Sequence, residues 1–312
     1  MIRYIAGRLL LILPVLFGVS IVVFMLIRLI PGNPAIAILG EHATPELIAR
    51  VQRQLGLNLP IWRQYLHFLG NASRGDFGLS FFYQEKVSTL TLERIPVTLT
   101  LICYAALLGL LIAVPFATLA AVRRETLVDH VIRLAFTATI GIPSFWLGIV
   151  LALLLSVKVR LFLLGGAGAG GLDTLWHLTL PALTIALHIS PILVRALRSS
   201  LIGVMDSDYV TTGLAMGLRP VTLLISYLLR NALTPFISVL GLNIGWLIGG
   251  TIIIEQVFGI PGVGSLLITS ILTRDYSIVQ FVTLVLAFLV ILVNLLTDLA
   301  YAALDPRVSF QR

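Results

Sequence analysis

Residues 97–121 read VTLTLICYAALLGLLIAVPFATLAA, a stretch of 25 residues without one charged side chain. The hydrocarbon core of a bilayer is about 30 Å thick, and an α-helix needs about 20 residues to cross it at about 1.5 Å per residue. The stretch is therefore long enough to span a membrane. Arg123 and Arg124, which follow one residue later, indicate where it returns to water.

Further apolar runs of this length recur along the chain. Continuous apolarity, rather than alternation, favours helices over membrane strands. We therefore predict an all-α membrane protein with six transmembrane helices, forming a single transmembrane domain over residues 1–312. The predicted spans are residues 9–30, 97–121, 134–157, 178–197, 233–258 and 279–304.

Composition agrees with this fold class. Of the 312 residues, 58% are hydrophobic and only 11% are charged, about half the charge of a soluble chain. The first span is too long for the apolar region of a signal peptide and is followed by no small-residue cleavage site, so we expect it to be retained. The net charge of +7 lies in loops between spans, so we expect no nucleic-acid partner.

Basic residues predict the orientation, because Lys and Arg accumulate in short cytoplasmic loops. Eleven lie on one side and four on the short flanks of the other, which places both termini in the cytoplasm. The first group is Arg3, Arg8, Arg123, Arg124, Arg133, Arg195, Arg198, Arg219, Arg230, Arg307 and Arg312; the second is Arg28, Lys158, Arg160 and Arg274.

Residues 31–96 then form an extracytoplasmic segment between the first and second spans. A helix is predicted from Thr44, which begins a capping box, to a stop at Gly56. An amphipathic piece follows at residues 61–69. The segment is either a scaffold lying along the membrane or a docking surface for an external partner. The glycine-rich run 165–171 is predicted to be a flexible outer loop.

Catalytic motifs are absent from the sequence. Neither Lys86 nor Lys158 belongs to a Walker A motif, there is no H-E-x-x-H, and the five histidines lack metal-ligand spacing. We therefore expect a non-catalytic chain without a cofactor or metal of its own.

Polar side chains within spans are costly in lipid and often mark a solute pathway. His188, Asn243 and Glu255 are the candidates here. Packing within the helix bundle would also account for His188, a hydrogen bond between helices for Asn243, and a salt bridge or cap for Glu255.

The stretch between the fourth and fifth spans, residues 198–232, is predicted to be a long cytoplasmic loop. Asp208 can cap a short helix that Gly217 would end. A short rigid helix projecting from a membrane bundle could be held by a soluble partner that moves the spans.

Here the sequence resembles the dipeptide/oligopeptide/nickel permease family of ABC importers, as a B-type permease. In that family this loop couples the permease to an ATPase. The resemblance assigns the coupling role to Asp208, Tyr209, Ala215, Gly217, Leu218 and Arg219. Matching blocks occur nearly end to end, at residues 29–35, 54–57, 75–80, 143–147, 230–235, 255–264, 274–276 and 294–307. The chain departs from the pattern at Met216, before the loop glycine, and at Gly213, where alanine is usual.

The resemblance implies a permease of the bacterial inner membrane that moves peptides or a related small solute by alternating access. Its expected partners are a second homologous permease, one or two ATPase subunits that bind ATP and Mg²⁺, and a periplasmic or lipid-anchored solute-binding protein. Dipeptides, oligopeptides, glutathione-like thiols and chelated nickel all remain open as the solute. An ion-coupled secondary transporter is the alternative, and it would carry acidic groups on broken helices at mid-membrane depth.

Overall fold

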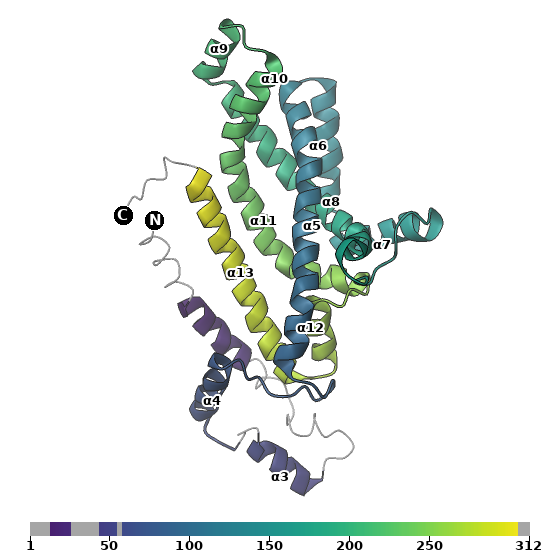
Figure 1. Cartoon of the computed structure of the whole chain (residues 1–312), viewed down its shortest axis with the longest axis vertical. Coiled ribbons are helices and arrows are strands. Elements are labelled where there is room, and N and C mark those ends of the chain that lie inside the picture. Colours follow the sequence, from purple (N-terminus) through teal and green to yellow (C-terminus); the bar gives the residue numbers. More distant parts are fainter. Residues whose placement is uncertain (1–12, 26–43, 55–57, 305–312) are drawn as a thin grey trace. The chain divides into compact units, whose positions relative to one another are not determined.

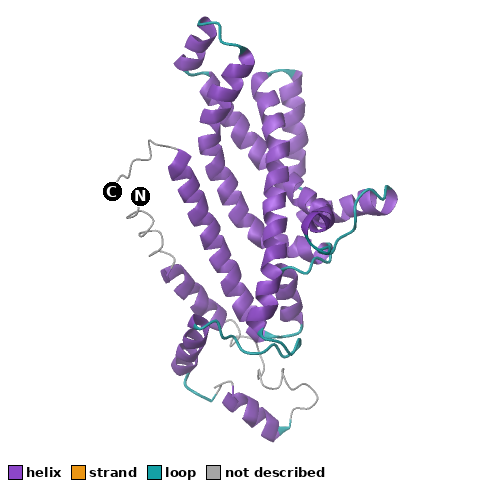
Figure 2. Ribbon diagram, viewed as in Figure 1, coloured by secondary structure: helices purple, strands orange, loops and turns teal. Residues whose placement is uncertain are grey.

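The structure is a computed structural model that describes residues 13–25, 44–54 and 58–304. Helices make up most of this described part (Figure 2), where the isolated backbone pairing is an antiparallel bridge between Leu79 and Lys86. Hydrocarbon offers no hydrogen-bond partners, and a helix forms the hydrogen bonds of its backbone N–H and C=O groups within itself. The predicted all-helical fold class is confirmed.

Four described helices are long and apolar enough to cross a membrane. They are α5 (Val87–Val122), α8 (Gly171–Met205), α11 (Arg230–Val257) and α13 (Tyr276–Leu304) (Figure 1). The predicted first span is described only over Leu13–Met25, which is an apolar helix. The count of six spans and the cytoplasmic termini stay predictions.

The prediction of one continuous third span over residues 134–157 is wrong. Instead, α6 (Leu127–Ile140) and the helix formed by α7 (Ser144–Leu151) with the π-helical segment η2 (Ala152–Lys158) meet at 105°. Pro143 explains the break, because proline lacks a backbone N–H and disfavours helical geometry in the residue before it. Counted as one bent span, this pair raises the number of candidate spans to five.

The chain divides into two compact units. Unit 1 contains residues 1–98 and 261–289, and unit 2 contains residues 99–260 and 290–312. Both α5 and α13 contribute residues to each unit.

Two short helices of unit 1 follow the first described helix, and they are α3 (Pro45–Gln54) and α4 (Ile61–Ser73). Thr44 lies just before α3 and its Oγ1 accepts a hydrogen bond of 3.4 Å from the N–H of Leu47. The predicted capping box is only half right, because its third helical position holds Leu47, which cannot return the bond. The predicted stop at Gly56 lies outside the described residues.

Asp275 holds the start of α13 to the loop after α4. Its carboxylate is buried and accepts hydrogen bonds from the hydroxyl of Ser80 at 2.6 Å and the backbone N–H of Phe82 at 3.3 Å. It also faces the N–H of Ile278 at 3.5 Å, in the first turn of α13. One carboxylate thus caps a helix and fixes a loop 195 residues away in sequence.

Unit 2 is built around α8. The buried share of the most apolar 18-residue window of each helix is 67% in α8, 39% in α5 and 33% in α11. Helix α8 packs against α6, α7 and α11. Its apolar window is less apolar than those of α5 and α13, which suits a helix that faces other helices more than lipid.

Glycines in α11 allow close contact with α13. A Cβ at Gly241 would collide with the side chain of Thr297, and one at Gly245 would lie 3.2 Å from the Oδ1 of Asn294. The two glycines are four residues apart and share a helix face. Small residues in this spacing let membrane helices approach closely.

The glycine-rich run after η2 is more than a flexible connector. A Cβ at Gly165 would collide with the backbone carbonyl of Phe258, at the end of α11. The N–H of Ala169 donates a 2.6 Å hydrogen bond to Asp173 in the first turn of α8. The segment is therefore packed against the end of α11 at Gly165 and hydrogen-bonded to the start of α8 at Ala169.

We expect Gly241→Ala to destabilise the protein by about 1–3 kcal/mol, the usual cost of overpacking a well-packed contact. Gly203→Ala, in α8, is the matched control, because a Cβ there has nothing within 4 Å. Thermal unfolding of the two variants in mild detergent checks this. Equal unfolding midpoints for the two variants would contradict the close packing of α11 on α13.

Candidate functional site

The segment after α8 contains a short helix, α9 (Asp208–Ala215), which ends in a tight turn. The N–H of Gly217 donates to the carbonyl of Leu214 at 3.0 Å, and the N–H of Leu218 donates to that of Gly213 at 3.1 Å. Gly217 has a φ of +77°, which L side chains rarely adopt. This is a Schellman motif, and it ends α9 where the sequence predicted.

The beginning of α9 differs in one detail. Ser207 occupies the N-cap position, and Asp208 is the first helical residue. Its negative charge still lies at the positive end of the helix dipole.

One face of α9 is anchored and the other is exposed. Val210 and Gly213 are buried, and α9 packs against the π-helical segment η3 (Leu223–Leu229). A Cβ at Gly213 would lie 2.9 Å from a terminal methyl of Leu223, so the usual alanine would require that side chain to shift. The predicted coupling residues lie mostly on the open side. Asp208, Tyr209, Ala215, Gly217 and Arg219 are exposed and Leu218 is half-buried.

A cavity of about 650 Å³ lies in unit 2 among α7, α8 and α11. His188 of α8 and Asn243 of α11 both line it, so the structure brings these two predicted residues together. Ser144, at the start of α7, is the third polar residue of the lining. The apolar and glycine lining residues are Ile185, Ile189, Ile192, Leu242, Trp246, Leu247, Gly249, Gly250 and Ile254.

Glu255 does not line this cavity with His188 and Asn243. It is fully buried near the end of α11, and its backbone carbonyl accepts a 2.8 Å hydrogen bond from the N–H of Ile260. Its role in a solute pathway stays a prediction.

Sequence reasoning missed two notable residues of the cavity. Trp246 lies among glycines on α11 and is 84% exposed, which is unusual for so large an aromatic side chain. Ser144 lines the cavity because the chain bends beside it. The tryptophan could have been noticed from its glycine neighbours, but the bend that brings Ser144 there was not predicted.

No group of three or more His, Cys, Asp or Glu side chains that could hold a metal ion occurs among the described residues. Among the described residues that line the cavity there is no Asp, Glu, Lys or Arg. The site therefore offers hydrogen bonds and apolar contact.

Several long apolar helices, a cavity among three of them and a short exposed helix are features of a membrane-spanning transport protein. Two family models match this chain. The binding-protein-dependent transport system inner membrane component matches residues 113–310, and the N-terminal model of such membrane components matches residues 1–102. The chain belongs to this family. It is the permease subunit of an ATP-driven importer of the inner membrane, in which ATP hydrolysis takes place on separate subunits.

Two relatives are similar over their full lengths. The glutathione transport system permease protein GsiC of Escherichia coli (strain K12) is 34% identical over 311 residues, 100% of both chains. The oligopeptide transport system permease protein AppB of Bacillus subtilis (strain 168) is 36% identical over 318 residues, 99% of this chain and 100% of AppB. The resemblance to peptide permeases is confirmed, and the importer is favoured over the ion-coupled alternative.

Solved structures support the fold. The chain matches the inward-facing MetNI methionine ABC transporter with a TM-score of 0.59 and 17% identity, over 69% of this chain and 96% of that chain. The type I importer permease fold is thereby shown.

The turn that ends α9 gives a test. We expect Gly217→Val to strain this turn by about 1–2 kcal/mol, because a β-branched residue is disfavoured at positive φ. Gly217→Asn is the matched control, since asparagine tolerates this conformation. Hydrogen exchange at the amide of Leu218 should rise roughly tenfold in the valine variant only. Equal exchange in both variants would contradict the left-handed turn.

Proposed function

We propose that this chain forms one half of the solute pathway of a type I importer for peptides or peptide-like solutes, and that α9 couples it to an ATPase. The observation that carries the proposal is the continuity of α8. One face of α8 lines the cavity through His188 and Ile192, and α9 begins three residues after α8 ends at Met205. A force on α9 therefore has a short, helical route to a wall of the cavity.

The solute class rests on the lining and on the relatives. A cavity of about 650 Å³ lies within the range of about 300–1,000 Å³ that holds drug-sized ligands. Its polar groups, Ser144, His188 and Asn243, can exchange hydrogen bonds with peptide amides. The names of the relatives GsiC and AppB refer to glutathione transport and oligopeptide transport.

The proposed partners follow from the family. A second homologous permease would complete the pathway, one or two ATPase subunits would bind ATP and Mg²⁺ against α9, and a periplasmic or lipid-anchored binding protein would deliver the solute. The chain would function as a single transmembrane domain with both termini in the cytoplasm. His188 and Asn243 would line the pathway, and Glu255, which is buried near the end of α11, stays a third candidate for it.

The exposed residues of α9 and of the turn that follows it suggest how an ATPase would bind. Tyr209, Leu214 and Met216 are exposed apolar side chains, and Arg219 adds one positive charge. Large exposed apolar side chains mark interaction sites when they gather on one surface. ATP-driven closure of two ATPase subunits would draw the α9 helices together and move the spans as rigid bodies.

Copurification tests this proposal. We expect the chain, extracted from native membranes in mild detergent, to bring with it a second permease and ATPase activity. Gly217→Val should lose most of the bound ATPase and Gly217→Asn should keep it, because only valine distorts the end of α9. Recovery of the chain alone, without ATPase activity, would overturn the importer complex.

The cavity is tested separately. We expect Gly250→Leu to reduce peptide uptake by the complete transporter several-fold, because Gly250 lines the cavity and a Cβ there has nothing within 4 Å. For the same reason its unfolding temperature should change little. Gly18→Leu, where a Cβ also meets no neighbour, is the control and should transport normally. Unchanged uptake by Gly250→Leu would remove the cavity from the solute pathway.

A further inference from the structure

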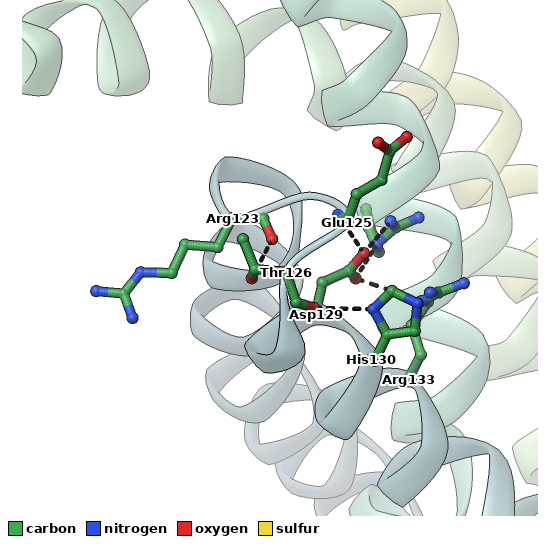
Figure 3. Close-up of polar contacts among 7 residues, drawn as sticks. Arg123, Glu125, Thr126, Asp129, His130 and Arg133 are labelled. Atoms are coloured by element: carbon green, nitrogen blue, oxygen red, sulfur yellow. Dashed lines mark hydrogen bonds and ion pairs between the residues drawn. The ribbon is translucent and has the colours of Figure 1, made fainter.

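Unit 2 contains a buried carboxylate that the proposed pathway does not use. Asp129 lies in the first turn of α6 and is fully buried. Arg198 of α8 donates to it twice, from Nε to Oδ1 at 2.7 Å and from Nη2 to Oδ2 at 2.7 Å. The N–H of Glu125 donates to Oδ2 at 3.1 Å, and the Nε of Arg133 lies 3.4 Å from Oδ1 (Figure 3).

These contacts make the pair geometrically rigid. A charge is buried at high cost unless it is paired and hydrogen-bonded, and Asp129 meets both conditions. Two parallel N–H···O bonds fix the orientation of the two groups as well as their distance. The side chain of Arg198 is itself only 19% exposed, so water competes little for it. The start of α6 is thus fixed to one position along α8.

A second ion pair between the same segments provides a comparison. Arg124, in the turn before α6, lies 3.0 Å and 3.1 Å from the two oxygens of Asp206, just after α8. Their side chains are 43% and 61% exposed. Exposed pairs contribute little, because water and salt screen them. Asp206 follows Arg198 by eight residues, about 12 Å along a helix, so two pairs join these segments and only one is buried.

Along the sequence, the buried pair lies between the cavity and α9, the two parts of the proposed solute pathway and its coupling. Arg198 lies ten residues after His188, which lines the cavity, and ten before Asp208, where α9 begins. On the other side, α6 continues from Asp129 to the bend, beyond which Ser144 lines the cavity. The pair therefore joins the two helices that lead to two different cavity walls.

We propose that Asp129 and Arg198 are positioning residues that make α6 and α8 one rigid lever, so that movement of α9 reaches both cavity walls together. This inference rests on the proposed coupling role of α9. Apolar contacts are not directional, so by themselves they resist sliding of α6 along α8 less than a bidentate ion pair does. A bidentate ion pair resists sliding, so the force is transmitted and not dissipated.

The test uses the complete transporter in proteoliposomes, with ATP hydrolysis and peptide uptake measured on the same sample. The double variant D129N/R198M is preferred, because it leaves no unpaired buried charge and the new amide oxygen can still accept from the N–H of Glu125. We expect assembly and ATP hydrolysis close to wild type. Uptake per ATP should fall about tenfold, within the usual range of coupling between sites. R124Q, which breaks only the exposed pair, should leave uptake per ATP unchanged.

Arg198→Lys provides a graded second variant, since it keeps the charge but cannot form the two parallel bonds. An intermediate uptake per ATP is expected. Wild-type uptake per ATP in D129N/R198M would overturn the inference. So would a fall of uptake and ATP hydrolysis in proportion to the amount of assembled complex, which would indicate a purely structural pair. Failure of the importer proposal would look different, because the wild-type complex itself would show no ATP-driven uptake.

Discussion

The burial of α8 is the constraint on which unit 2 depends. With 67% of its most apolar window buried, α8 is in contact with α6, α7 and α11. A helix in this position cannot move without its neighbours, since packed interiors shift as bodies and do not deform continuously. The cavity face and the Asp129–Arg198 pair lie at successive heights of this one helix. A movement of α8 is then transmitted by these contacts, and no reactive side chain is needed.

Glycines determine where neighbouring helices pack closely against each other and where they leave space between them. Gly241 and Gly245 lie against α13, whereas Gly249 and Gly250 line the cavity with open space around them. The same glycine-rich helix therefore supplies a tight contact on one part of its surface and room for a solute on another. Gly165 plays a third part, because its missing side chain lets the segment after η2 contact the backbone at the end of α11.

Much of the site followed from the sequence, for local reasons. The end of α9 at Gly217 was predictable because a helix stop depends on a few neighbouring residues, and glycine at a positive φ is a strong local signal. His188 and Asn243 were found because polar groups are rare in apolar runs. Glu255 was selected by the same rule but lies buried outside the cavity lining, because composition does not tell which way a side chain points.

Sequence alone determined that the chain is helical, membrane-bound and without catalytic motifs, because span length and apolarity are properties of continuous stretches. Resemblance over nearly the whole chain added the importer family. The tertiary structure decided the rest. It showed the 105° bend that brings Ser144 to the cavity, and the pairing of Asp129 with Arg198 across 69 residues. Such features depend on which helices become neighbours, and a contact between distant residues leaves no periodic trace in one sequence.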